Sequence, residues 1–497
     1  MKKVIIIGAG FSGLSAAAFM AKAGWDVTVL EKHSMAGGRA RKFTGDGFTF
    51  DMGPSWYWMP DVFERFFNSF GKRVSDYYQL VRLDPSYRVY WPNDSMDLPA
   101  DYKAIRTLFE LTEPGSGKML DKFMEEAAYK YQVGMHKLVY KPGQSLMEFA
   151  NLDLLKGIFK LDVFTSIRKH IFRYFKYEKL RQLLEFPVLF LGALPSETPA
   201  LYSLMNYADI KLGTWYPQGG MHKIVEGMVS VAKELGVKFF FNHNMVELGL
   251  EENVISSVSC DVTNDAGTTR DIFVADVIIN SADYHFFEST LLPEQFRSYS
   301  SEYWNKRVMA PGSLLYYIGL EKKLEGITHH TLFFDTDFEM HGSEIYKKPV
   351  WPTAPLFYVC ATSVTDAGVA PANCENLFFL IPVAAGLEGD TDELRDHYFD
   401  LILERYEKKI GQRIKEHIVF KRSYGLSNFK EDYNSFKGNA YGLANTLMQT
   451  AVFKPGLRSK KVKNLFYTGQ LTVPGPGVPP SLISGEVAAN EVIKHFG

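Results

Sequence analysis

The sequence predicts an α/β fold in which one parallel, Rossmann-like sheet is assembled from three separated parts of the chain. The N-terminus begins with a β-branched run, a glycine-rich turn and a helix of small residues. Short apolar runs recur at residues 275–281 and 464–469, each ending in small residues. Strands that are buried on both faces of a parallel sheet are continuously apolar rather than alternating. Two long segments between these pieces are therefore predicted to be insertions.

Length and composition exclude several classes of protein. The 497 residues suffice for two to four domains, at roughly 150 residues per domain. A net charge of −2 argues against a nucleic-acid binder, and 46% hydrophobic residues argue against disorder. Three cysteines cannot form a disulfide framework, which favours a reduced, cytoplasmic-side protein. The aromatic content of 14% suits a large apolar ligand or a lipid surface, and equally a generous core.

The first 31 residues form a complete βαβ pattern. Lys3–Ile7 is a predicted strand, and residues 8–13 are an intact G-x-G-x-x-G. A helix is expected over residues 14–23 and a second strand over 26–30, which ends on Glu31. This order of elements is the fingerprint of dinucleotide binding.

The fingerprint residues have separate physical tasks. Gly8 permits the tight turn, Gly10 lets the backbone approach a pyrophosphate, and Gly13 lets helix and strand pack closely. The free N–H groups and positive dipole of the helix N-terminus face the phosphates. Glu31 is placed to accept hydrogen bonds from ribose hydroxyls.

The segment after the second strand indicates which dinucleotide binds. Residues 35–40 contain Gly-Gly-Arg, and Arg39 can bind a phosphate unless this is an ordinary surface turn. With residues 47–54, this segment resembles the FAD-binding N-terminus shared by flavin amine oxidases, protoporphyrinogen oxidases and carotenoid desaturases. The resemblance implies FAD, with NAD the alternative. The cofactor-binding residues expected here are Gly8, Ala9, Gly10, Phe11, Ser12, Gly13, Glu31, Lys32, Gly38, Arg39, Gly53, Pro54 and Ser55.

The C-terminal segment carries the more specific resemblance. A strand at 464–469, a stiff loop at 470–480 and a helix from 481 are similar to the signature of bacterial-type carotenoid (phytoene) desaturases. The matching positions are Asn464, Phe466, Gly469, Thr472, Pro474, Gly475, Gly477, Val478 and Ser484. The chain departs from that pattern at Gln470, Leu471, Val473 and Pro476; Val473 puts a histidine beside the flavin in doubt. The resemblance implies cofactor contacts from Gly469, Gln470, Gly477, Val478, Pro479 and Leu482.

The middle of the chain extends the resemblance to nearly the whole length. Residues 215–221 precede a predicted helix at 222–235 and a strand at 238–241, as in the desaturases and their amine-oxidase relatives. In such relatives the next segment brings a backbone edge, here at Val246, against the adenine, and a small-residue turn, here Ser281 and Ala282, abuts FAD.

The predicted architecture is a discontinuous Rossmann-like FAD-binding domain with two insertions. Its three parts are residues 1–60, 211–285 and 430–497. Residues 61–210 are expected to be a helical region for substrate and membrane contact, and residues 286–429 a substrate-binding mixed sheet.

A basic stretch at residues 156–181 predicts contact with a membrane surface. Eight lysines and arginines alternate there with aromatic and aliphatic residues, a pattern typical of interfacial helices and also of surface helices packed on their own domain. We expect a peripheral protein on the cytoplasmic side of the membrane. No run approaches the ~18 apolar residues of a spanning helix.

The resemblance implies an FAD-dependent oxidoreductase of carotenoid biosynthesis. The expected reaction is introduction of C=C bonds into phytoene or a partly desaturated carotene, with oxygen or a quinone as electron acceptor. Glu148 is the implied proton acceptor, although Asn151 replaces a basic partner found in relatives. One alternative is an enzyme like the flavin amine oxidases or protoporphyrinogen oxidases. Another is a prenyl-binding escort protein on the same fold.

No metal site is predicted from the sequence. The chain has no H-E-x-x-H motif and no Cys/His cluster. His222, His329 and His330 are predicted to be core or surface residues rather than ligands.

Overall fold

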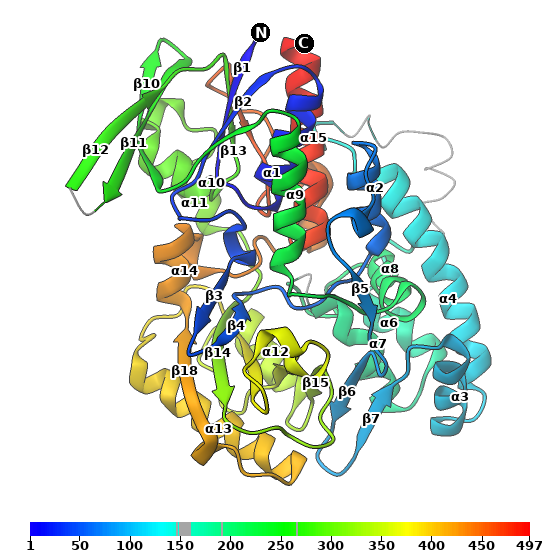
Figure 1. The fold of residues 1–497 in the computed structure, drawn as a ribbon. Coiled ribbons are helices and arrows are strands. Elements are labelled where there is room, and N and C mark those ends of the chain that lie inside the picture. Colours follow the sequence, from blue (N-terminus) through cyan, green and yellow to red (C-terminus); the bar gives the residue numbers. More distant parts are fainter. Residues whose placement is uncertain (146–147, 149–160, 190–191, 265–266) are drawn as a thin grey trace.

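The computed structural model describes residues 1–145, 148, 161–189, 192–264 and 267–497. A five-stranded parallel sheet lies beside both termini (Figure 1). Its strand order is β19 (Leu465–Tyr467), β13 (Val277–Asn280), β1 (Lys3–Ile7), β2 (Asp26–Leu30) and β9 (Lys238–Phe240). All five strands fall within the three segments expected to build the cofactor domain.

Helix α1 (Phe11–Lys22) packs between α15 (Val478–Phe496) and α9 (His222–Glu234) against this sheet (Figure 1). Small residues make the close approach possible. A Cβ at Gly13 would lie 2.0 Å from the Gly8 carbonyl oxygen, and one at Gly485 would lie 2.2 Å from the Ser12 carbonyl oxygen. The first and last helices of the chain are thus locked together where α1 leaves the glycine turn.

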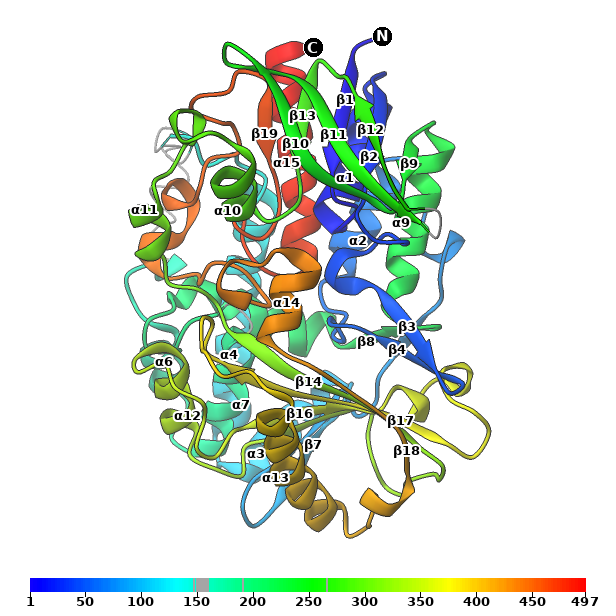
Figure 2. The ribbon, with the colours of Figure 1, turned by 90° about the vertical axis from the view of Figure 1, so that its left-hand side faces the viewer.

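A second, seven-stranded mixed sheet forms the other half of the molecule (Figure 2). Its order is β18 (Ile418–Tyr424), β14 (Gly312–Leu320), β17 (Glu375–Val383), β16 (Phe357–Cys360), β15 (His330–Phe333), β6 (Tyr87–Tyr90) and β7 (Ser95–Leu98). Strands β6 and β7 come from the segment 61–210, which was expected to be helical. The first insertion therefore completes the sheet of the second.

The two faces of this sheet have different partners. Alternate residues of a strand point to opposite faces. Tyr316 and Ile318 pack with helix α13 (Asp392–Ile410), whereas Leu315 and Tyr317 belong to the main core on the other side. Strand β14 is buried at every position for this reason.

The basic stretch is broken into two helices in its described part, rather than forming one. Helix α6 (Ile167–Tyr174) begins at Ser166, whose Oγ accepts a hydrogen bond from the Lys169 N–H, and α7 (Glu178–Leu189) follows. Residues 149–160 lie outside the described part of the chain. Within the described residues, no helix is both long and apolar enough to cross a membrane.

The remaining elements connect or flank these layers. A three-stranded antiparallel sheet consists of β10 (His243–Glu251), β11 (Val254–Asn264) and β12 (Gly267–Phe273). Two small pairs are β3 (Lys42–Gly45) with β4 (Phe48–Asp51), and β5 (Leu80–Arg82) with β8 (Trp215–Pro217). The other α-helices in the part of the chain that the structure describes are α2 (Pro60–Asn68), α3 (Tyr102–Thr112), α4 (Ser116–Val133), α8 (Leu204–Tyr207), α10 (Tyr284–Phe286), α11 (Ser301–Asn305), α12 (Phe338–Tyr346) and α14 (Leu426–Tyr433).

Candidate functional site: one cavity with two ends

One large cavity lies between the two sheets and is lined by all five predicted segments of the chain. We call the part near the glycine turn the nucleotide end, and the part against the seven-stranded sheet the apolar end. The predicted cofactor residues that line the cavity are Gly8, Gly10, Phe11, Ser12, Glu31, Lys32, Gly38, Arg39, Gly53, Pro54, Ser55, Ser281, Ala282, Gly469, Gln470, Gly477, Val478 and Pro479.

The glycine turn leaves open space where a dinucleotide would pass. Gly8 has a φ of +95°, which favours glycine, and its N–H donates to the Leu30 carbonyl at 2.8 Å. A Cβ placed on Gly10 would meet no atom within 4 Å, although Gly10 begins α1. This space in front of a helix N-terminus fits a pyrophosphate.

Glu31 is fixed by backbone donors at the end of β2. Its Oε2 accepts from the Ala9 N–H at 2.8 Å and its Oε1 from the His33 N–H at 3.0 Å. Burial raises the pKa of the Glu31 carboxyl above its usual value, and the two N–H groups oppose this rise. The carboxylate joins the glycine turn to the strand end, and its remaining lone pairs are available to ribose hydroxyls.

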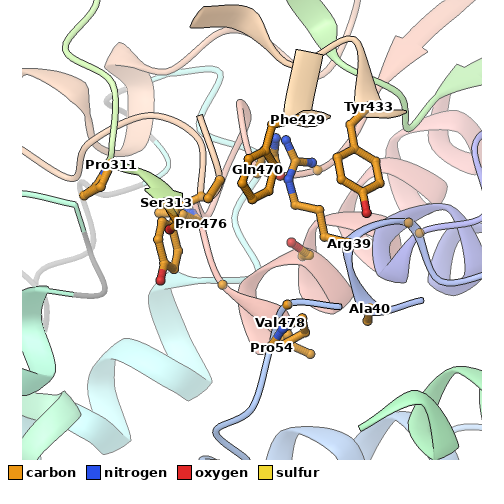
Figure 3. Close-up of a pocket in the computed structure, with 18 of the residues that line it drawn as sticks. Arg39, Ala40, Pro54, Pro311, Ser313, Phe429, Tyr433, Gln470, Pro476 and Val478 are labelled. Atoms are coloured by element: carbon orange, nitrogen blue, oxygen red, sulfur yellow. The ribbon is translucent and has the colours of Figure 1, made fainter. Parts of the chain in front are cut away.

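Arg39 is a half-buried cation at the nucleotide end. Its Nη2 donates to Ser435 Oγ at 3.1 Å and to the Asn439 carbonyl at 3.3 Å, and the guanidinium lies 5.0 Å from the centre of the Tyr433 ring. Figure 3 shows Arg39 between Phe429 and Tyr433. Its Nε has no hydrogen-bond partner among the described residues. Among the described residues no carboxylate forms an ion pair with Arg39, and such a cation in a cavity wall suits an anionic ligand such as a phosphate.

The C-terminal loop is held in place by hydroxyl groups. Ser484 Oγ accepts from the Gly469 N–H at 2.9 Å, and Thr472 Oγ1 donates to the Gly469 carbonyl at 2.8 Å. Gly477, with a φ of +112°, precedes the first turn of α15. These bonds explain why hydroxyl residues are needed at 472 and 484: they fix the loop whose residues Gln470, Pro476 and Val478 line the cavity.

Some predicted residues lie behind the cavity wall. Ala9 contributes its N–H to Glu31, while Gly13 and Leu482 lie within helix packing and do not line the cavity. The start of β10 reaches the cavity with residues 243–245 rather than with Val246.

Glu148 is not brought to the cavity. Its carboxylate accepts hydrogen bonds from the N–H groups of Gly143, Gln144 and Ser145 at 2.9–3.0 Å. The carboxylate therefore closes a local turn, and no cavity-lining contact supports the catalytic role that the resemblance implies.

The apolar end is built from side chains that are distant in the sequence. Trp56 and Trp58 pack with Phe186 at ring distances of 5.6 and 6.0 Å. The sheet supplies one wall and the helices α7 and α12 supply another. The apolar residues lining this end include Trp56, Trp58, Phe186, Leu189, Met205, Leu332, Phe334, Phe338, Leu356 and Leu380. Two features of the sequence pointed to this chamber: the aromatic excess and the substrate-binding mixed sheet predicted over residues 286–429.

Arg168 also lines the cavity, which differs from its predicted place on a membrane-facing surface. Its guanidinium pairs with Glu185 through two bonds of 2.7 and 3.0 Å, and it also contacts Glu339. This cation is therefore neutralised by protein carboxylates and cannot be counted as a free surface charge.

His329 and His330 are buried, as the sequence reading allowed. His329 Nδ1 lies 2.7 Å from Thr365 Oγ1, and His330 Nδ1 lies 2.6 Å from Tyr358 Oη. Each Nε2 has no partner among the described residues. Burial lowers the pKa of both imidazoles, to about 3 for His329. One potential ligand atom from each of His329, His330 and Cys360 lies within 4.8 Å of the others.

Comparison with known proteins gives concordant results. The family of flavin-containing amine oxidoreductases matches residues 11–309. A "Carotenoid 3,4-desaturase" of Haloarcula japonica is 40% identical over 99% of this chain and 98% of its own length. A "zeta-carotene-forming phytoene desaturase" of Myxococcus xanthus is 29% identical over 99% and 94%. Among solved structures, an oxidoreductase from Methanosarcina mazei superimposes with a TM-score of 0.63 at 15% identity, covering 99% of this chain and 100% of the other.

Proposed function

The chain belongs to the family of flavin-containing amine oxidoreductases and is an FAD-dependent oxidoreductase, and on this premise we propose that it desaturates a carotenoid. The observation that carries the proposal is the single cavity, whose nucleotide end continues into an aromatic chamber. The similarity to the Haloarcula japonica desaturase over nearly both full lengths supports it. The substrate class is a long polyene, such as phytoene or a partly desaturated carotene.

FAD, when bound, accepts a hydride from the polyene. The chain's own residues have three tasks in this reaction. Glu31, Gly10 and Arg39 bind and orient the cofactor at the nucleotide end. The apolar lining excludes water from the reacting carbons. Aromatic faces such as those of Trp56 and Trp58 stabilise the positive charge that hydride loss leaves on the polyene.

The two alternative functions make different demands on the two ends of the cavity. An amine or tetrapyrrole oxidase would need charged groups there for a polar substrate, but Arg168 is already paired with carboxylates. An escort protein would need no cofactor, whereas this chain retains open space at Gly10 and a partly unpartnered Arg39. Both observations favour the desaturase.

The decisive experiment is product analysis by chromatography. Purified protein with FAD is incubated with liposomes that carry phytoene or partly desaturated carotenes. We expect loss of two hydrogens per double bond formed. Turnover of amines or protoporphyrinogen without carotenoid turnover would contradict the proposal, and so would colourless protein that releases no flavin on denaturation.

We also propose that the enzyme works at a membrane surface without spanning it, on the cytoplasmic side. The support is a water-insoluble substrate class and the exposed residues of the α6 region. Phe164 is 83% exposed and Phe172 is 43% exposed, and the Arg173 side chain, which follows Phe172, is 57% exposed. We further propose oxygen or a membrane quinone as electron acceptor, which anaerobic reoxidation of the reduced protein by each would distinguish.

Cosedimentation with anionic liposomes tests the membrane contact. Replacing Lys169, Arg173 and Lys176 by glutamine should weaken binding by about 1 kcal/mol per charge, and high salt should have the same effect. Arg168→Gln is the matched control, because this arginine is 19% exposed and lies 2.7 Å from Glu185, whereas Arg173 is 57% exposed and lies 4.0 Å from Asp162. Binding that ignores both salt and the triple variant would remove this surface from the proposal.

A further inference from the structure

The proposed desaturation needs a proton acceptor, and most candidate bases near the cavity are already engaged. The Glu148 carboxylate accepts three backbone N–H groups. The Glu339 carboxylate contacts Arg168. His341 lines the cavity, but its Nδ1 accepts from the Leu356 N–H at 3.0 Å and its Nε2 lies 2.9 Å from the Pro382 carbonyl. Neither nitrogen of His341 can take a proton without losing a buried hydrogen bond.

Three side chains, Ser55, Tyr358 and His330, form a connected row that leads from the cavity into the sheet. Tyr358 and Ser55 both line the cavity, and the Tyr358 oxygen lies 3.0 Å from Ser55 Oγ. The Tyr358 oxygen is also 2.6 Å from His330 Nδ1. His330 is fully buried, and its ring stacks on Trp56 with 4.1 Å between centroids.

The positions of Ser55, Tyr358 and His330 suit a part in the reaction better than a purely structural role. Tyr358 is a polar residue in a sheet wall whose other cavity-lining residues include Leu332, Leu356 and Leu380. Ser55 directly follows Gly53 and Pro54, which are predicted to contact the cofactor. Burying polar groups in an apolar wall costs free energy, so the hydrogen-bonded chain calls for a function at the boundary between the two ends of the cavity.

We propose that Tyr358 is the catalytic proton acceptor of the desaturation and that His330, acting through Tyr358, is the final site of the proton. This inference rests on the proposed function. The hydride leaves one substrate carbon with its electron pair and goes to FAD. The electrons of the neighbouring C–H bond form the new C=C, and that proton goes to the Tyr358 oxygen. In the Nε2–H tautomer, His330 Nδ1 accepts the Tyr358 hydroxyl proton across 2.6 Å, and that proton passes to Nδ1 as the substrate proton arrives on the Tyr358 oxygen.

A weak base suffices for this step. A C–H bond next to a carbocation is strongly acidic, so the acceptor is chosen by position rather than by a high pKa. The unit positive charge stays within the protein throughout, because it moves from the polyene to the imidazole as the proton is transferred. Trp56 stacks on that imidazole and lines the cavity, so one aromatic face serves both positions of the charge.

The test compares Tyr358→Phe and His330→Gln with wild type in an anaerobic single turnover of a carotenoid, in which the desaturated product is followed by chromatography. We expect formation of the desaturated product to slow by about 100-fold or more in both variants. Tyr316→Phe is the matched control, because it removes a buried hydroxyl, bonded at 2.8 Å to the Arg395 carbonyl, from the opposite face of the same sheet. Flavin content, measured from the visible absorbance, should equal that of wild type in Tyr358→Phe, which removes a single oxygen atom.

Two further readouts separate catalysis from packing. A substrate deuterated at the carbon that loses the proton should show a larger isotope effect in the variants, because proton loss becomes limiting. The longer-lived cation should also capture water, giving a hydroxylated carotenoid labelled by ¹⁸O-water. A Tyr358→Phe enzyme with the wild-type rate would overturn the proton transfer through Tyr358 and His330. A slow Tyr358→Phe enzyme without the larger isotope effect and without the hydroxylated product would also overturn it, and both outcomes leave the proposed function standing. If no carotenoid reduces the wild-type flavin, the proposed function is wrong, and the proton transfer through Tyr358 and His330 is then wrong as well.

Discussion

The two ends of the cavity are built in opposite ways. The nucleotide end is made chiefly of backbone, glycine and a few fixed charges, and its fingerprint occupies a short stretch from Gly8 to Glu31. The apolar end is made of large side chains from β15, β16, α7, α12 and the run at Trp56–Trp58. From this difference we infer that cofactor binding depends on space that glycines leave open, whereas substrate binding depends on which large side chains line the wall.

The largest expected effect is at the nucleotide end. Gly10→Val should abolish FAD retention while leaving the fold intact, because Gly10 has an ordinary φ of −77° and its Cβ would enter open space. Flavin content and thermal unfolding of the purified apoprotein measure the two properties. Gly13→Ala is the contrasting variant, since its Cβ would collide with the Gly8 carbonyl and should destabilise the protein itself. Gly10→Val protein with a full complement of flavin would refute the fingerprint assignment.

A smaller effect is expected at Glu31. Glu31→Ala leaves the Ala9 and His33 N–H groups without their acceptor, at a cost of about 1–3 kcal/mol for each buried group. FAD affinity should fall, and added FAD should partly restore activity, unlike in Gly10→Val. Titration of apoprotein with FAD by fluorescence quenching gives the affinity. Glu31→Gln keeps one carbonyl acceptor and should lie between the two, so equal affinity in all three proteins would contradict the role of Glu31.

The smallest effect on cofactor, and a selective one on substrate, is expected at the apolar end. Phe186→Leu removes the ring that packs on Trp56, Trp58 and Tyr87, and should raise KM for the carotenoid a few-fold without changing flavin content. Steady-state kinetics and absorbance measure the two quantities. Loss of flavin in this variant would show that the two ends are not separable in the way we describe.

The sequence predicted the strands and the glycine turn at the nucleotide end, because their requirements are local. The strands Lys3–Ile7 and Asp26–Leu30 have the predicted bounds, and the glycine turn lies between them. Periodicity could not place β6 and β7 in the second sheet, because β6 pairs with β15, some 240 residues later. For the same reason the sequence could not predict the place of Arg168 in the cavity wall, because its partner Glu339 lies on another helix, distant in the sequence. The role of Glu148 as proton acceptor was implied by the resemblance alone, and the turn that its carboxylate closes could not be predicted from the sequence.

The order of strands in the five-stranded sheet has a consequence for synthesis. Strand β19 and helix α15 are made from residues 465–496, yet β19 pairs with β13, and α15 packs on α1 at the glycine turn. A nascent chain emerges N-terminus first, so the fingerprint leaves the ribosome more than four hundred residues before the surface that completes it. The early α1 must wait with an apolar flank uncovered. The site for FAD is therefore complete only after residues 465–496 have been synthesised, and FAD that binds then stabilises a chain that is already folded.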